Sequence, residues 1–130
     1  MEVELRASLP TLLVVDDDAG IVNALSNLLE DEGYQVVAAE NGKRGLELVE
    51  AGLRPSAIIL DLMMPVMDGW DFRAEQLRDP AIRETPVIVL TATGFSRQTI
   101  RDQFGGVEYL PKPPPTGHLL DMLRRVCGPD

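Results

Sequence analysis

Short apolar runs recur along the chain at intervals that suit alternating strands and helices. Five runs rich in Val, Ile and Leu start 24, 22, 30 and 20 residues apart, namely Thr11–Val15, Gln35–Ala38, Ala57–Leu60, Val87–Thr91 and Val107–Leu110. Several are continuously apolar, which is typical of strands in a parallel sheet covered by helices on both faces. Each interval has room for one crossover helix. The pattern predicts an α/β fold, a (βα)5 doubly wound sheet of five parallel strands.

The segments between these runs carry helical periodicity and helix-end signals. Apolar residues from Ile21 to Leu29 form one stripe, and Gly33 ends that helix. We expect the other helices at Gly42 to about Glu50, from Asp68-Gly69 to about Arg78, at about Ser96 to Gln103 and from about Thr116 onward. One domain over residues 11–127 follows, with short tails at 1–10 and 128–130.

Composition and charge narrow the classes of partner. The 130 residues include 12 Lys and Arg against 21 Asp and Glu, a net charge of −9, and 45% are apolar. Binding to nucleic acid or to an anionic membrane needs a basic face, so we expect neither. Cys127 is the one cysteine and has no internal disulfide partner. No apolar run is long enough to span a bilayer, and we expect a cytoplasmic protein.

Chemistry-bearing side chains stand at the ends of several predicted strands. Asp16, Asp17 and Asp18 follow the first run, Asp61 follows the third, Thr91 ends the fourth, and Lys112 comes just after the fifth. The carboxyl ends of parallel strands lie at one edge of the sheet, where α/β proteins bind ligands. The sequence therefore predicts a single cleft that joins carboxylates, a hydroxyl and an ammonium group.

Clustered carboxylates repel one another and call for a counter-charge. Oxygen ligands without His or Cys favour a hard divalent cation, with Mg²⁺ the first choice and Mn²⁺ the alternative. A carboxylate beside such an ion, with a lysine and a hydroxyl opposite, has the groups that phosphoryl transfer needs. An aspartyl phosphate is the expected intermediate.

Simpler interpretations apply to some of these residues. We expect Asp18 to cap the helix that follows it rather than to bind metal. Met63, Met64 and Met67 fit loop or packing positions, since thioethers suit soft metals and no Cys or His joins them. His118 has no partner acid nearby and reads as a surface histidine.

Four segments resemble the receiver domain of bacterial two-component response regulators. They are LLVVDDD at Leu12–Asp18, IILDLMMPVMDGW at Ile58–Trp70, VIVLTA at Val87–Ala92 and YLPKP at Tyr109–Pro113. The resemblance covers about residues 11 to 127 and is closest in kind to single-domain, chemotaxis-regulator-like receivers. It implies a flavodoxin-like strand order of 2-1-3-4-5.

The resemblance also implies a role for each site residue. Asp61 would accept a phosphoryl group from the phosphohistidine of a sensor histidine kinase or phosphotransfer protein, without acting as an enzyme on other substrates. Asp16, Asp17, Asp61 and the backbone carbonyl of Met63 would hold Mg²⁺. Thr91 and Lys112 would bind phosphoryl oxygens, and the Lys112-Pro113 bond would be cis.

The same resemblance implies a switch. Tyr109 would turn inward when Thr91 is drawn toward the phosphoryl group, and a downstream effector protein would read the fourth helix, fifth strand and fifth helix. A homodimer that forms on phosphorylation is a further expectation. Phe95 and Phe104 are apolar candidates on that face, although a core position suits Phe104 better. Thr93 and Met63 would flank the path of attacking water.

Two departures from the family pattern and two rival interpretations accompany this assignment. The stretch from Thr91 to Lys112 is about one residue shorter than usual, which predicts a short or mobile fourth helix. The proline-rich PKPPPTG segment puts the start of the last helix in doubt.

An aspartate-nucleophile phosphohydrolase of the haloacid-dehalogenase type shares Asp16-x-Asp18, but only Asp121 and Asp130 lie beyond Lys112 to supply its later acidic pair. The last rival is a receiver fold used only as an interaction module. One receiver uses nearly the whole chain, so we expect any output to pass through a partner.

Overall fold

Five parallel strands form a single sheet at the centre of the molecule. The computed structural model describes residues 10–91, 97–105 and 107–127. Its strands, in the order β2-β1-β3-β4-β5, are β1 (Thr11–Val15), β2 (Gln35–Ala39), β3 (Ala57–Asp61), β4 (Val87–Thr91) and β5 (Glu108–Pro111). Every neighbouring pair is parallel. The predicted (βα)5 sheet and its strand order are both confirmed.

Within the described residues, five helices connect and follow the strands. They are α2 (Ala19–Asp31), α3 (Gly42–Glu50), α4 (Gly69–Arg78), α5 (Arg97–Phe104) and α6 (Thr116–Cys127). Asp18, Asn41 and Asp68 cap the first three, because each side-chain oxygen accepts a hydrogen bond from a backbone N–H of the first turn. Just beyond the C-terminal end of α2, Gly33 has a φ of 98°, a conformation that glycine adopts without steric cost.

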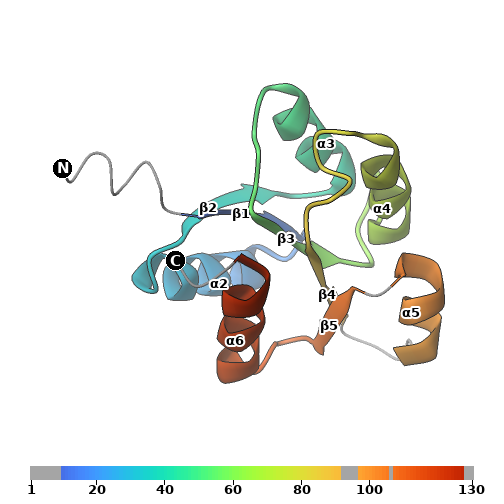
Figure 1. Cartoon of the computed structure of the whole chain (residues 1–130). Coiled ribbons are helices and arrows are strands. Elements are labelled where there is room, and N and C mark those ends of the chain that lie inside the picture. Colours follow the sequence, from blue (N-terminus) through green and yellow to red (C-terminus); the bar gives the residue numbers. More distant parts are fainter. Residues whose placement is uncertain (1–9, 92–96, 106, 128–130) are drawn as a thin grey trace.

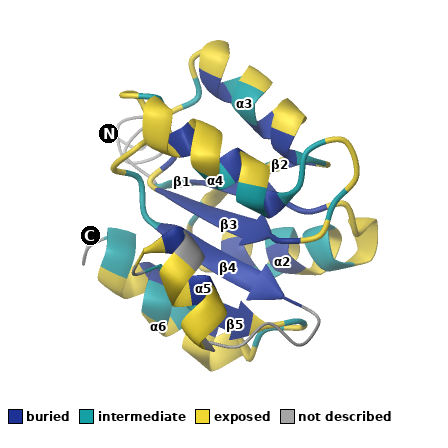
Figure 2. Cartoon of the chain, turned by 90° about the vertical axis from the view of Figure 1, so that its right-hand side faces the viewer, coloured by how far each residue is buried: buried dark blue, intermediate teal, exposed yellow. Residues whose placement is uncertain are grey.

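The helices cover both faces of the sheet (Figure 1). Between helices and sheet lie two apolar cores. Alternate residues of a strand point to opposite faces, so Leu12 and Val14 pack with α2 and α6, whereas Leu13 and Val15 pack on the face of α3, α4 and α5. β3 and β4 are buried along their whole length (Figure 2). The central strands therefore hold their C-terminal ends, where the predicted site lies, in fixed positions.

Element boundaries differ from the expected ones by one residue at several places. β3 includes Asp61, which we expected just after the strand, and β5 begins at Glu108 instead of Val107. Both shifts follow from ladder pairing, since Asp61 still pairs with Leu90 and Glu108 with Ile88. The described helix after β4 has eight residues and starts at Arg97, while its expected start at about Ser96 lies outside the described residues. α6 begins at Thr116 in spite of the preceding prolines. Among the described helices, none combines the length and apolar character that crossing a membrane requires.

Candidate functional site

Three carboxylates meet at the C-terminal edge of the sheet. Asp16 and Asp17 follow β1, and Asp61 ends the neighbouring strand β3. One carboxylate oxygen from each lies within 4.8 Å of the others. Asp16 is only 2% exposed and Asp61 5%, whereas Asp17 is exposed to solvent. Asp16 and Asp61 are therefore enclosed by the protein, whereas Asp17 lies at the solvent-facing opening of the site.

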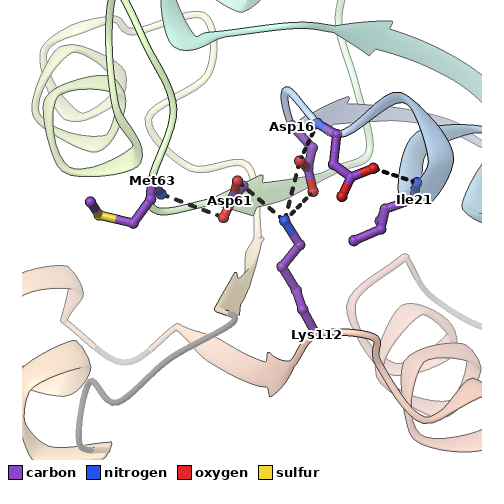
Figure 3. Close-up of polar contacts among 6 residues, drawn as sticks. Asp16, Ile21, Asp61, Met63 and Lys112 are labelled. Atoms are coloured by element: carbon purple, nitrogen blue, oxygen red, sulfur yellow. Dashed lines mark hydrogen bonds and ion pairs between the residues drawn. The ribbon is translucent and has the colours of Figure 1, made fainter.

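Lys112 connects the two buried acids, as Figure 3 shows. Its Nζ lies 3.0 Å from Asp16 Oδ2 and 3.3 Å from Asp61 Oδ2, and it donates a hydrogen bond of 3.2 Å to Asp16 Oδ1. The backbone N–H of Lys112 donates to the carbonyl oxygen of Thr91, which ties the residue to the end of β4. The Lys112-Pro113 peptide bond is cis, as expected.

Burial and charge act against each other at these groups. Loss of water around Asp61 raises the pKa of its carboxyl group, and the negative charge of Asp16 raises it further, while Lys112 partly opposes both effects. Burial alone would lower the pKa of Lys112, but its hydrogen bond to Asp16 and the charges of Asp16 and Asp61 outweigh burial and raise it. The lysine is therefore held as a cation, and the acids remain short of positive charge.

The acid cluster fits a divalent metal ion. Asp16 Oδ1 accepts hydrogen bonds from the backbone N–H of Asp18 and from Lys112, but Oδ2, although buried and close to Nζ, accepts no hydrogen bond from the described residues. Buried carboxylate oxygens are normally satisfied. Among the described residues, one lysine pairs with two of the three acids. The potential ligands are all oxygens, which suits a hard cation such as Mg²⁺.

Thr91 and Tyr109 lie on neighbouring strands and share one face of the sheet. Val89 pairs with Tyr109 and Thr91 with Pro111, so the threonine lies two positions beyond the tyrosine along the ladder. Thr91 is buried at the end of β4, and half-buried Tyr109 packs against the core on the side of α3, α4 and α5. A movement of the Thr91 side chain therefore takes place close to Tyr109, on the same face of the sheet.

The loop after β3 is held against the site by close backbone contacts. A Cβ atom on Gly69 would lie 2.5 Å from the carbonyl oxygen of Asp61 and 2.9 Å from Leu62 Cα. The Gly69 N–H donates to the Leu62 carbonyl oxygen, and the Met63 N–H donates to Asp61 Oδ1 at 3.4 Å. Within this loop, exposed Val66 has a φ of 69°, which is unfavourable for a β-branched residue.

A family model for the response regulator receiver domain matches residues 12–124. The chain belongs to this family. Its relatives include response regulator MprA of Mycolicibacterium vanbaalenii, which is 37% identical over an alignment of 120 residues that covers 88% of this chain and 49% of MprA. Transcriptional regulatory protein CpxR of Escherichia coli K12 is 35% identical over 116 residues, 88% of this chain and 48% of CpxR. The chain spans about half the length of these relatives.

Solved receiver structures have the same architecture as this receiver domain. Chemotaxis protein CheY4 of Vibrio cholerae is 31% identical, with a TM-score of 0.82 over 92% of this chain and 99% of CheY4. The receiver domain of a sensor histidine kinase of Pseudomonas aeruginosa PAO1 is 28% identical, with a TM-score of 0.81 over 93% of this chain and 99% of that domain. That structure has a magnesium ion coordinated in its active-site cleft. The match favours a receiver over a phosphohydrolase and places the chain among signalling proteins.

The remaining predicted residues fall into place as follows. Asp18 caps α2 by accepting from the Ile21 N–H at 3.1 Å, and His118 is exposed on α6. Phe104 is buried in the core, as the simpler interpretation held. Met64 and Met67 pack against the same core, whereas Met63 is exposed. Phe95 and Thr93 lie outside the described residues.

Sequence reasoning missed the contacts that shape this receiver site. It singled out neither the approach of Gly69 to the backbone of Asp61 nor the double pairing of Lys112. The Asp68-Gly69 pair was read only as a helix start, although glycine directly after a capping residue is also compatible with a close backbone contact.

Proposed function

We propose that this receiver domain accepts a phosphoryl group on Asp61 from the phosphohistidine of a sensor histidine kinase or phosphotransfer protein. One observation carries the proposal: a buried carboxylate at the end of the central strand β3 lies 3.3 Å from a lysine and within a cluster of three acids. A buried structural aspartate needs only a counter-ion. Here two further acids lie at the same edge, and the three carboxylates together could bind a divalent cation.

The transfer is a displacement at phosphorus. A carboxylate oxygen of Asp61 attacks the phosphorus atom, the P–N bond breaks, and its electron pair returns to the imidazole nitrogen of the donor. The product is an acyl phosphate on Asp61. Later attack of water on phosphorus releases inorganic phosphate and restores the carboxylate, so the domain catalyses only its own phosphorylation and dephosphorylation.

Asp16, Asp17 and Asp61 would hold Mg²⁺, with the backbone carbonyl of Met63 as a fourth protein ligand. Bound Mg²⁺ would neutralise negative charge on the acids and on the phosphoryl oxygens. The proposal is supported by the acceptor on Asp16 Oδ2 that no described donor satisfies and by the shared edge of the three acids. The Met63 N–H donates to Asp61 Oδ1, so the backbone of Met63 begins beside the carboxylate, which supports this assignment.

Lys112 and Thr91 would bind phosphoryl oxygens. Lys112 already lies between Asp16 and Asp61, so it reaches a group on Asp61 without crossing the site. The Thr91 hydroxyl would donate to another oxygen, and the movement of Thr91 would let Tyr109 turn inward. A phosphoryl group adds about 1.5 to 2 negative charges, which is enough to bias such a local two-state change.

The partners follow from this cycle. We propose that residues 11–127 form the receiver unit, that the donor kinase phosphorylates it in the cytoplasm, and that a downstream effector protein reads α5, β5 and α6. Phosphorylation would also favour pairing of two copies through that face.

Incubation with Mg²⁺ and acetyl phosphate tests the proposal directly. Intact-mass spectrometry is expected to find one labile phosphoryl adduct on the native protein and none on Asp61→Asn, because the amide is a far poorer nucleophile than the carboxylate. Asp18→Asn is the matched control, since Asp18 lies at the same edge but only caps α2.

Asp18→Asn is expected to form the adduct as the native protein does. An adduct that persists in Asp61→Asn, or that peptide mapping places on Asp16, would overturn the assignment. Repeated turnover of varied phosphate esters would favour the phosphohydrolase instead.

A further inference from the structure

The helix after β4 contacts α4 at its C-terminal end, which lies away from the site. α5 ends at Phe104, whose ring is buried and lies 4.8 Å from the Trp70 ring of α4, centroid to centroid. α4 and α5 lie on the same face of the sheet and contact one another (Figure 2).

Arg73 joins the two helices at this end. Its Nη2 donates a hydrogen bond of 2.8 Å to the carbonyl oxygen of Phe104, and its Nη1 donates one of 2.9 Å to Gln76 Oε1. The last carbonyls of a helix have no intrahelical donor and carry partial negative charge. A guanidinium group is well suited to that position because it is a fixed cation with several N–H donors.

Gln76 extends the connection to the segment that leads into β4. Its side chain is fully buried, and Nε2 donates to the carbonyl oxygens of Ile82 at 2.9 Å and Thr85 at 3.0 Å. Arg73, Gln76 and these carbonyls form a continuous polar network from the base of β4 to the C-terminal end of α5. The network lies at the opposite end of the fold from Asp61.

The arginine does not fit a purely stabilising role. Burial lowers the pKa of its guanidinium, no described carboxylate forms an ion pair with it, and its buried Nε–H has no acceptor among the described residues. An unsatisfied buried donor costs about 1–3 kcal/mol. Arg73 is better explained by the groups that it holds, the carbonyl oxygen of Phe104 and the side chain of Gln76.

We propose that Arg73 is a positioning residue that anchors the C-terminal end of α5, so that a rearrangement beginning at Thr91 displaces the Arg97 end of the helix about Phe104. The displacement rests on the proposed function, whereas the anchor itself does not. α5 would then move as a lever, with its C-terminal end at Phe104 fixed and its N-terminal end displaced. A partner that reads its exposed face would sense a tilt instead of a translation.

Hydrogen exchange tests the anchor without phosphorylation. Arg73→Met removes both hydrogen bonds and keeps most of the apolar stem. Its control is Arg78→Met on the same helix, because Arg78 forms an exposed ion pair with Glu75. Amide exchange in residues 101–105 is expected to rise about tenfold in Arg73→Met and to stay unchanged in Arg78→Met, with both proteins folded.

Equal exchange in the two variants would overturn the anchor. Because the test uses the unphosphorylated protein, failure of Asp61 to accept a phosphoryl group does not affect it.

Distance measurements between spin labels test the lever. In a Cys127→Ser background, one label is placed on α2 by Asn27→Cys and the other by Gln98→Cys or Asp102→Cys, all at exposed positions. Gln98 and Asp102 share one exposed hydrogen bond, so either substitution removes the same contact. Intact mass reports phosphorylation by acetyl phosphate in each sample.

In phosphorylated protein, the distance change is expected to be larger from Gln98→Cys than from Asp102→Cys. Adding Arg73→Met is expected to abolish that difference, and adding Arg78→Met to preserve it. Equal changes at both labels, no change at either in a phosphorylated sample, or a difference that survives Arg73→Met would each overturn the proposal. A sample that gains no phosphoryl mass would instead count against the proposed function, and the exchange experiment would still decide the anchor.

Discussion

Asp61 carries a charge that the folded chain stabilises poorly. Its carboxylate is buried, and Asp16 lies in the same cluster, so the pKa of Asp61 is raised above its ordinary value. A raised pKa in the folded state means that ionisation at neutral pH favours the unfolded chain. The proposed phosphoacceptor is thus a point of instability, as functional groups often are.

Asp61→Asn is therefore expected to raise the free energy of unfolding at pH 7 by about 1 kcal/mol, an increase in Tm of a few degrees. Lys112 keeps Asp16 as its partner in this variant. The advantage should shrink as the pH falls through the raised pKa of Asp61, because native Asp61 then becomes neutral as well. The measurement is the Tm of both proteins in metal-free buffer at several pH values between about 4 and 8, a range in which a carboxyl group with a raised pKa titrates. A native protein as stable as the variant at pH 7 would contradict it.

Val66 is a second residue held in an unfavourable state. It is 76% exposed and has a φ of 69°, so little packing opposes its replacement. Val66→Gly is expected to be more stable than Val66→Ala by about 1 kcal/mol, since only glycine adopts this backbone conformation without steric cost. Urea unfolding of the two variants makes the comparison, and equal midpoints would rule out strain at this position.

At the scale of elements, the contact between the end of β3 and the start of α4 decides the geometry of the site. Gly69, the first residue of α4, lies against the backbone of Asp61 and Leu62. The helix can begin there only because this residue has no side chain. A glycine that looked like a simple helix start is thus also a spacer between two elements.

Gly69→Ala is expected to lower the free energy of unfolding by about 1–3 kcal/mol, because the added methyl group must displace backbone. It should also slow the phosphorylation of Asp61 by acetyl phosphate. Gly117→Ala in α6 is the matched control, since nothing lies within 4 Å of its Cβ position, and alanine suits a helix better than glycine. Chemical unfolding and the rate of adduct formation are the measurements. Equal stability of the two variants would show that the contact at Gly69 yields easily.

At the scale of the whole molecule, sequence patterns predicted the architecture well and the contacts between elements poorly. Continuous apolar runs located all five strands, with boundaries that shifted by a residue at β2, β3 and β5, because buried strands need little besides Val, Ile and Leu. The acids were predictable because strand ends share an edge. The bridging position of Lys112 and the anchor at Arg73 were not, since both depend on distances between side chains and partners far apart in the chain.

Ion binding is linked to unfolding of the whole domain. A ligand that binds only the folded state stabilises it in proportion to the logarithm of its concentration. Mg²⁺ is expected to raise the Tm of the native protein and to have a much smaller effect on Asp17→Asn, which loses the solvent-facing carboxylate of the cluster. Asp18→Asn should respond as the native protein does, because asparagine also caps helices. A Tm response to Mg²⁺ that is equal in all three proteins would exclude Asp17 as a ligand.

The close approach of Gly69 to the backbone of Asp61 also makes the α4 side of the site rigid. On the side of α4, backbone already touches backbone at Asp61, and there is no room for inward movement. On the opposite side, the site is bounded by Thr91 and by Lys112, which hold their places through side-chain and strand-end contacts. Added volume at Asp61 therefore has no room on the α4 side, which leaves the solvent-facing opening and the side of β4 and β5. The lack of a side chain at Gly69 thus limits the directions in which the site can change when a group is added to Asp61.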